Sequence, residues 1–146
     1  MNIEIIKAKQ TDIDFLTEIE KHCFSDPWNR DTLIYSIDND IVFILKADEK
    51  PLGYIICQSV LDEMTVLRIG VLPEFRRSGY AEKLLRFITE KSDIAVCFLE
   101  VRKKNTAARK LYEKVGFKSI GERKNYYKEP ADDAVIMIKS SNRDLS

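Results

Sequence analysis

The sequence is poor in glycine and proline, the residues that most often interrupt helices and strands: of its 146 residues, 5 are glycine and 4 are proline. This composition argues against a collagen-like chain, a disordered chain and two domains joined by a linker. No apolar run approaches the roughly 20 residues of a membrane-spanning helix, and the first residues lack the basic flank and cleavage site of a signal peptide. We therefore expect one soluble cytoplasmic domain over residues 1–139, a polar tail over residues 140–146 and no membrane partner.

Cysteine and histidine are also scarce. The three cysteines, Cys23, Cys57 and Cys97, are odd in number, lie far apart and have apolar neighbours, which is typical of buried thiols in a reducing cytoplasm. A zinc site needs clustered ligands, and the only histidine, His22, does not complete one at these spacings, so we expect no metal. His22 is either a catalytic imidazole or a helix-surface residue, and its place beside Cys23 favours the surface.

Net charge is absent as well, because 24 basic and 24 acidic side chains balance. A neutral chain has no overall attraction to nucleic acid or to an anionic membrane, so a polyanion must be bound by a local patch. Residues 102–110 include five basic side chains and no aromatic one, whereas a nucleic-acid interface interleaves the two. We expect no direct nucleic-acid partner, and interpret this basic run as a solvated helix start or a contact for cofactor phosphates.

Hydrophobic periodicity predicts an α/β fold with the element order β-α-α-β-β-β-α-β-α-β-β. We expect strands at residues 3–8, 41–47, 52–61, 64–71, 95–101, 118–128 and 134–139, and helices at 13–23, 31–37, 79–91 and 106–115. Thr11 and Asp12 are the expected N-cap residues of the first helix, and Asn105 that of the last, which Gly116 ends. The strands between residues 41 and 71 predict an antiparallel meander, and the apolar strand 95–101 a central place in the sheet.

A strand, a glycine-containing loop and a helix start follow one another between Ile69 and Ala81. Consecutive backbone N–H groups at such a turn, with the helix N-terminus behind them, form a cradle for phosphate. Arg76 and Arg77 add local positive charge. The pattern is neither a P-loop nor a dinucleotide fingerprint. Two interpretations therefore stay open, a phosphate site and an ordinary helix start with exposed arginines.

Glu100 and Tyr112 are the candidate base and acid. Glu100 stands at the end of an otherwise apolar strand, where a carboxylate is costly unless it is paired or catalytic. Tyr112 lies two turns after Asn105 on the same helix face, and a phenol with a carboxylate suits acid and base catalysis. Each residue also has a structural interpretation that stays open. In it, Glu100 forms an ion pair with Arg102 or a nearby lysine, and Tyr112 is a core aromatic residue with a hydrogen-bonded hydroxyl.

Together these segments resemble the acetyl-CoA-binding core of the GCN5-related N-acetyltransferases. The resemblance rests on Ile69-Gly70-Val71 followed by Arg76-x-x-Gly79-x-Ala81, and on Asn105-x-x-Ala108-x-x-Leu111-Tyr112-x-x-x-Gly116-Phe117. The order of elements agrees with that fold over the whole chain. More narrowly, four short segments resemble the ribosomal-protein-alanine N-acetyltransferases, the RimI type. They are Asp26-Pro27-Trp28, Asp62-Glu63, Leu99-Glu100-Val101-Arg102 and Lys124-Asn125-Tyr126-Tyr127.

The resemblance implies the GNAT fold, a mixed and mostly antiparallel sheet of six to seven strands with helices on both faces, and acetyl-CoA as cosubstrate without a metal. It implies that Glu100 accepts a proton from the attacking amine and that Tyr112 donates one to the leaving thiolate. The positions that it assigns to acetyl-CoA are Ile69, Gly70, Val71, Arg76, Arg77, Ser78, Gly79, Tyr80, Ala81, Glu82 and Asn105.

For the acceptor, the resemblance implies the N-terminal alanine of a small-subunit ribosomal protein, usually number eighteen, bound by a monomer or weak dimer. Trp28, Tyr126 and Tyr127 are the expected acceptor-binding residues, and the acidic residues Asp62 and Glu63 predict a fit for basic peptides. Two alternatives stay open: the same chemistry on a lysine or a small-molecule amine, and a non-catalytic CoA-binding module.

Overall fold

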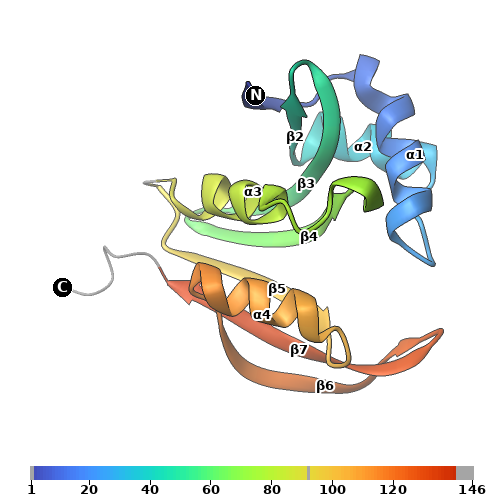
Figure 1. Ribbon diagram of the computed structural model, residues 1–146. Coiled ribbons are helices and arrows are strands. Elements are labelled where there is room, and N and C mark those ends of the chain that lie inside the picture. Colours follow the sequence, from blue (N-terminus) through green and yellow to red (C-terminus); the bar gives the residue numbers. More distant parts are fainter. Residues whose placement is uncertain (1, 92, 141–146) are drawn as a thin grey trace. The chain divides into compact units, whose positions relative to one another are not determined.

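The computed structural model describes residues 2–91 and 93–140, and its elements follow the predicted order (Figure 1). The elements are β1 (Ile3–Lys7), α1 (Ile13–Cys23), α2 (Arg30–Asn39), β2 (Ile41–Ala47), β3 (Lys50–Val60), β4 (Glu63–Val71), α3 (Tyr80–Thr89), β5 (Val96–Arg102), α4 (Thr106–Val115), β6 (Lys118–Lys128) and β7 (Ala131–Ser140). Short 3-10 turns cover Gln10–Asp12 and Pro73–Phe75. Ser140 pairs with Val96 in the sheet, so the predicted tail begins one residue too early; its remaining residues lie outside the described part.

The seven strands are hydrogen-bonded in the order β1-β2-β3-β4-β5-β7-β6. The pairs β1 with β2, β2 with β3, β5 with β7 and β6 with β7 are antiparallel, whereas β4 and β5 are parallel. A parallel pair needs a crossover connection, which here contains α3. β5 has a neighbour on both sides, as predicted for its apolar sequence. The sheet is therefore mixed and mostly antiparallel, as expected.

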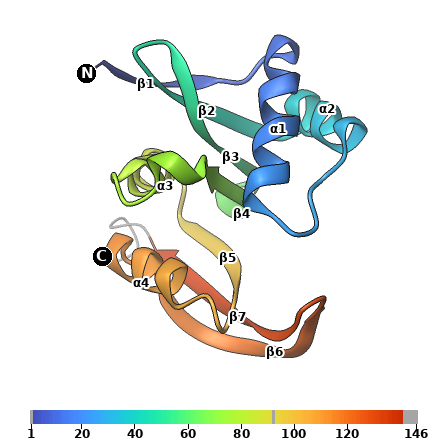
Figure 2. The ribbon, with the colours of Figure 1, turned by 45° about the vertical axis from the view of Figure 1, so that its right-hand side comes forward.

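The chain forms two compact units, and β4 contributes to both of them. Residues 1–58 and 67–85 form the first unit, and residues 59–66 and 86–146 the second. In the first unit, α1 and α2 pack on β2 and β3 through the fully buried side chains of Leu16, Ile19, Leu33, Ile44 and Ile56. Figure 2 shows both helices alongside these strands. Each such side chain contributes about 1.5–3 kcal/mol by burial, which positions α1 and α2 firmly.

The predicted N-cap of α1 is wrong in its mechanism. Asp12 does precede the helix, but its side chain does not cap it. The Asp12 carboxylate instead accepts the Lys9 N–H at 2.8 Å and stabilises the 3-10 turn before the helix. For α2, the side chain of Asn29 accepts the Thr32 N–H at 2.9 Å, so the helix begins at Arg30, one residue earlier than predicted.

In the second unit, α4 has the predicted ends. The Asn105 side chain accepts the Ala108 N–H at 3.2 Å, and Gly116 ends the helix with φ of 117°, a value that favours glycine. Tyr112 and Val115 on the inner face of α4 are buried, as are alternate residues of β5 and the residues Ala134, Val135 and Met137 of β7. β6 is exposed along nearly its whole length and has two register irregularities against β7.

All three cysteines are free thiols. Cys57 and Cys97 are buried as predicted, and burial raises the pKa of Cys97 to about 12. Cys23 is only half-buried, because it ends α1 beside the end of β4, where its Sγ donates a hydrogen bond to the Val71 carbonyl at 3.3 Å. Within the described residues, no helix is both long and apolar enough for a transmembrane span.

Candidate active site

The end of β4 is built around a close approach of two backbones in the first unit. A Cβ on Gly53 would lie 2.8 Å from the Gly70 carbonyl oxygen, so β3 and β4 need a glycine there. A Cβ on Gly70 would lie 2.9 Å from a Tyr54 ring carbon and 3.2 Å from the Cys23 Sγ. Packing therefore fixes the strand Ile69-Gly70-Val71, which the sequence assigned to acetyl-CoA, against α1 and β3.

The loop after β4 turns through two residues of positive φ into the start of α3. Arg77 and Gly79 adopt φ of 63° and 82°, and an added Cβ on Gly79 would meet nothing within 4 Å, so conformation rather than space requires this glycine. The Lys83 N–H donates to the Gly79 carbonyl at 3.1 Å, where α3 starts. The first N–H groups of a helix point beyond its N-terminus and attract anions. Ser78 and Gly79 are exposed, Ala81 and Glu82 are half-buried and Tyr80 is buried.

Arg76 braces this loop. Its Nε donates to the Val71 carbonyl at 3.1 Å, and the same oxygen accepts the Cys23 thiol. The guanidinium thus ties the loop back to the strand that precedes it. Part of the positive charge that the sequence assigned to phosphate therefore has a structural partner within the first unit.

Glu100 projects from β5 on the side opposite to its buried neighbours Leu99 and Val101. Its carboxylate is 34% exposed and forms an ion pair with the Arg123 Nε on β6 at 2.8 Å. The predicted ion pair of Glu100 with Arg102 or a lysine is therefore wrong. The pairing of β5 with β7 and of β7 with β6 brings Arg123 to Glu100 instead. An exposed ion pair contributes only about 0–1 kcal/mol, so Arg123 can leave Glu100 at small cost.

Tyr112 lies on the inner face of α4, and its ring meets that of Phe117 edge-on at a centroid distance of 6.0 Å. Burial, with a smaller contribution from the nearby Tyr127, raises the pKa of Tyr112 to about 12. The phenol is therefore protonated over the whole physiological pH range. A protonated hydroxyl at this position has the state that a proton donor requires.

Tyr127, an expected acceptor-binding residue, lies on β6 in the second unit. Burial, followed by the Glu100 charge, raises the pKa of Tyr127, and Tyr127 in turn contributes to the raised pKa of Tyr112. The guanidinium of Arg102 lies 4.2 Å from the centroid of the Tyr127 ring, while the Tyr126 ring contacts it edge-on at a centroid distance of 5.1 Å. The second unit thus carries Glu100, Tyr112 and Tyr127 on β5, α4 and β6.

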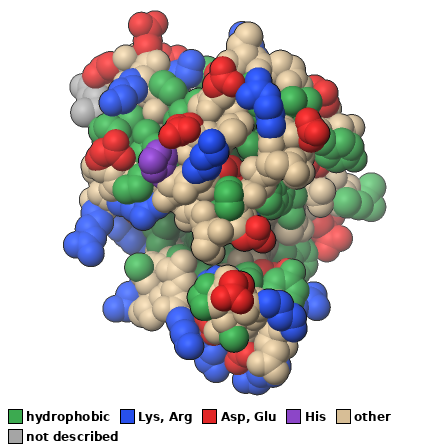
Figure 3. Space-filling model, turned by 90° about the vertical axis from the view of Figure 1, so that its right-hand side faces the viewer, with side chains coloured by type: hydrophobic (Ala, Val, Ile, Leu, Met, Phe, Trp, Pro, Cys, Tyr) green, Lys and Arg blue, Asp and Glu red, His purple; other side chains and the backbone are tan. Residues whose placement is uncertain are grey.

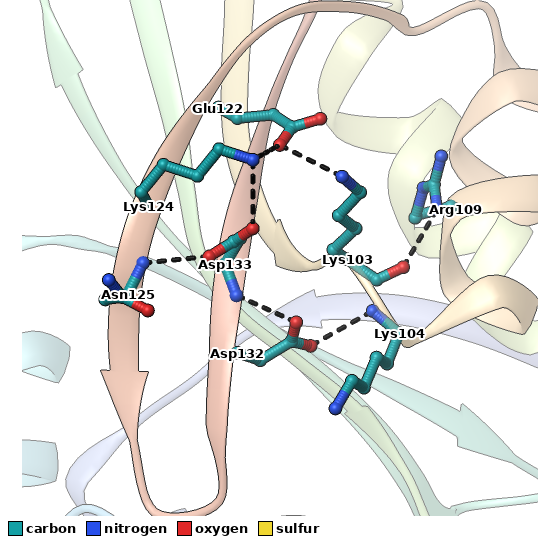
Figure 4. Close-up of polar contacts among 8 residues, drawn as sticks. All are labelled: Lys103, Lys104, Arg109, Glu122, Lys124, Asn125, Asp132 and Asp133. Carbon is teal, nitrogen blue, oxygen red and sulfur yellow. Dashed lines mark hydrogen bonds and ion pairs between the residues drawn. The ribbon is translucent and has the colours of Figure 1, made fainter.

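The loop from β5 to α4 is fastened to the hairpin of β6 and β7 (Figure 4). The Lys104 N–H donates to the Asp132 carboxylate at 3.0 Å, and the Lys103 N–H donates to the Asp133 carbonyl at 2.9 Å. Arg109 on α4 donates to the Lys103 carbonyl at 2.8 Å. These bonds hold Asn105, the residue after Lys104 and an expected acetyl-CoA contact, in a fixed position relative to the hairpin.

Ion pairs complete this polar network (Figure 4). Lys103 and Lys124 pair with Glu122 at 3.2 and 3.1 Å, and Lys124 also pairs with Asp133 at 3.3 Å. Hydrogen bonds from Lys124 and Lys103 lower the pKa of Glu122, and those from the Asn125 N–H and Lys124 lower that of Asp133. Part of the basic run 102–110 therefore binds protein groups rather than presenting uncompensated charge.

The sequence interpretation missed a buried charged cluster in the first unit. Glu20 of α1 is fully buried and binds the Tyr54 hydroxyl, the Arg68 guanidinium and the Trp28 N–H, the last at 2.7 Å. Trp28, an expected acceptor-binding residue, is thus held by a carboxylate that no motif contained. The available signal was a glutamate and an arginine within apolar segments, where each charge requires a partner.

His22 is a surface residue, as its sequence context favoured. Its Nε2 lies 3.1 Å from the Glu18 carboxylate one helical turn earlier, and its side chain is 52% exposed. Figure 3 shows the imidazole, in purple, at the surface, where basic and acidic side chains are interspersed. Among the residues that the structure describes, no three potential ligands cluster around a metal position.

Three comparisons with known proteins agree with one another. A model of the acetyltransferase (GNAT) family matches residues 13–117. The ribosomal protein bS18-alanine N-acetyltransferase of Haemophilus ducreyi is 37% identical over 135 residues, which are 88% of this chain and 93% of that protein. The structure of the ribosomal-protein-S18-alanine N-acetyltransferase of Escherichia coli has a TM-score of 0.88 at 32% identity, over 95% of this chain and 94% of that one. NAA60 of Arabidopsis thaliana, solved with acetyl-CoA, shares the fold with a TM-score of 0.86 at 16% identity, over 96% of this chain and 100% of that one.

Proposed function

Because the chain belongs to the acetyltransferase (GNAT) family and is an N-acetyltransferase, we propose that it acetylates the N-terminal alanine of a small-subunit ribosomal protein. The observation that carries this proposal is the 37% identity, over 88% of the chain, to an enzyme named for alanine of ribosomal protein bS18. The chemistry of the second unit supports it, because Glu100 offers a carboxylate and Tyr112 a buried, protonated phenol, which suit base and acid catalysis.

The first unit offers the groups that suit acetyl-CoA. The backbone of Ile69, Gly70 and Val71 would hold the pantetheine arm, and the loop from Arg77 to Glu82 would receive the pyrophosphate. An exposed turn with a glycine at φ of 82° and a helix N-terminus behind it fits an anion of this kind. Bound acetyl-CoA supplies the acetyl thioester, and no covalent acyl-enzyme is needed.

The second unit supplies the proton transfers. Glu100 accepts a proton from the attacking amine, directly or through a water molecule, as the new C–N bond forms. Tyr112 donates its hydroxyl proton to the thiolate as the C–S bond breaks. Afterwards Glu100 releases its proton to solvent and Tyr112 regains one, so the sum is one acetyl transferred and one thiol released.

The pKa of the amine favours an N-terminal acceptor. Deprotonation at pH 7 costs about 1 kcal/mol for an α-amino group, with a pKa of about 7.8, but about 4.6 kcal/mol for a lysine, with a pKa of about 10.4. A single carboxylate, Glu100, is adequate for the first acceptor, whereas a lysine would need more help to lose its proton.

Three peptides test this proposal. The enzyme and acetyl-CoA are incubated with an Ala-initiated peptide of the ribosomal protein N-terminus, with its N-blocked, lysine-containing counterpart and with a Leu-initiated version, and thiol release is followed. We expect acetylation of the free N-terminus only. A preference for the blocked peptide would refute N-terminal acetylation, and equal rates for Ala-initiated and Leu-initiated peptides would contradict the choice of alanine.

A further inference from the structure

The buried ion pair of Glu20 and Arg68 has several further hydrogen-bonding partners. The Glu20 side chain is fully buried, and that of Arg68 is 15% exposed. One carboxylate oxygen of Glu20 accepts the Trp28 N–H at 2.7 Å and an Arg68 Nη2–H; the other accepts the Tyr54 hydroxyl and the Arg68 Nε at 3.2 Å. Burial and the adjacent Glu20 carboxylate raise the pKa of Tyr54, which keeps its hydroxyl a donor.

Arg68 is also stacked between two aromatic rings. Its guanidinium carbon lies 3.7 Å from the centroid of Phe24 and 5.0 Å from that of Trp28, and its Nη2 donates to the Asp26 carbonyl at 3.3 Å. Because a guanidinium is planar and weakly hydrated, it can stack on aromatic rings and at the same time donate two hydrogen bonds to a carboxylate. Arg68 therefore contacts the segment 24–28 through two rings and one carbonyl.

Few backbone hydrogen bonds hold the segment between α1 and α2. Its flanking backbone bonds run from the Phe24 N–H to the Glu20 carbonyl at 3.0 Å and from the Leu33 N–H to the Asn29 carbonyl at 3.1 Å. Within the described part of the chain, residues 25–28 make no backbone–backbone hydrogen bond. Phe24 and Trp28 pack against the hydrophobic core of the first unit, and Glu20 and Arg68 add the polar contacts that fix the segment at Asp26 and Trp28.

We propose that Glu20 and Arg68 are positioning residues that fix Trp28 for the acceptor and thereby set the affinity for the peptide rather than the rate of acetyl transfer. This inference rests on the proposed function, in which Trp28 binds the acceptor. Arg68 immediately precedes Ile69, so the same strand carries the acceptor-positioning guanidinium and the backbone proposed for acetyl-CoA. Neither Glu20 nor Arg68 exchanges a proton with the substrate in this scheme.

Kinetics of Arg68→Met and Arg68→Lys test the proposal, with Arg30→Met as the matched control. Arg30 forms an exposed ion pair with Asp14 at 2.7 Å that also joins α1 to the start of α2, but it has no aromatic partner among the described contacts. We expect Arg68→Met to raise the KM for the Ala-initiated peptide about tenfold while kcat and the KM for acetyl-CoA change less than about twofold. Arg68→Lys keeps the charge without the planar fork and should show a smaller increase, and Arg30→Met no increase.

Trp28 supplies an independent readout because it is the only tryptophan of the chain. We expect Arg68→Met to shift the Trp28 emission and to increase its quenching by acrylamide, while the far-UV circular dichroism stays that of the wild type. If Arg68→Met does not fold, the same measurements on Arg68→Lys and on Glu20→Gln, which keeps the shape of the carboxylate, decide the matter.

Two results would overturn the proposal. One is an unchanged peptide KM together with altered Trp28 emission, which would separate the segment from acceptor binding. The other is a parallel loss of kcat and of the affinity for both substrates, which would indicate a structural role alone. If the wild-type enzyme itself fails to acetylate the Ala-initiated peptide, the proposed function is wrong, and this outcome is recognised before any variant is compared.

Discussion

The raised pKa of Tyr112 predicts a specific loss of stability at high pH. The folded-state pKa is about 12, because burial disfavours the phenolate, whereas an unfolded tyrosine has a pKa of about 10. A group with a raised pKa contributes its stabilisation fully below the unfolded pKa, and this contribution disappears as the pH rises through the folded pKa. The contribution of Tyr112 is therefore intact up to about pH 9 and is lost between about pH 10 and pH 12.

The size of the effect follows from the two pKa values. Between pH 9 and pH 11 the unfolded phenol ionises almost fully and the folded one hardly at all, which lowers the free energy of unfolding by about 1 kcal/mol. Tyr112→Phe has no ionisable hydroxyl and lacks this decrement. Tyr54, Tyr127 and Cys97 also have raised pKa values, but they are present in both proteins, so their contributions largely cancel in the difference.

Urea unfolding of wild type and Tyr112→Phe at pH 9 and pH 11 measures this difference directly. We expect the wild type to lose about 1 kcal/mol more than the variant over this interval. Equal losses would show that Tyr112 ionises normally in the folded protein. In that case its hydroxyl is not buried as the structure has it.

Two further predictions concern the chemistry and the packing of the candidate site. Glu100→Gln and Tyr112→Phe should each lower kcat by about 10²–10⁴, measured as thiol release, because each removes one proton transfer; unchanged kcat in both variants would leave a CoA-binding module without catalysis. Gly70→Ala should destabilise the fold by about 1–3 kcal/mol more than Gly121→Ala, since its Cβ would lie 2.9 Å from the Tyr54 ring and that of Gly121 meets nothing within 4 Å. Equal unfolding midpoints of the two alanine variants would contradict the close packing at β4.

Local patterns predicted most of the elements, because their physical causes are local. α4 has its cap at Asn105 and its end at Gly116, as expected, since both depend on backbone groups within four residues. Asp12 shows the limit of such patterns. A carboxylate near a helix start has several N–H groups within reach, and here it binds that of Lys9 in the preceding turn.

Local sequence patterns could not predict side-chain contacts between residues that are distant in sequence and that the fold brings together. Glu100 was expected to pair with a residue close in sequence, yet it pairs with Arg123, two strands away in the hydrogen-bonded order. The register between β6 and β7 shifts twice, so the strand ranges alone do not determine which β6 side chain reaches β5. Glu20 and Arg68 are 48 residues apart and meet only through the packing of α1 on β4 and its neighbours.

The balanced charge of the chain also limits how phosphate can be bound. The Arg76 Nε donates a hydrogen bond to the Val71 carbonyl, Arg102 donates to the Pro130 carbonyl at 2.7 Å, and Lys103 forms an ion pair with Glu122. Several of the basic side chains that the sequence offered to phosphate are thus already engaged within the protein. Because backbone N–H groups at a helix start carry partial positive charge, we expect the loop and first turn of α3, rather than these side chains, to determine the affinity for the pyrophosphate.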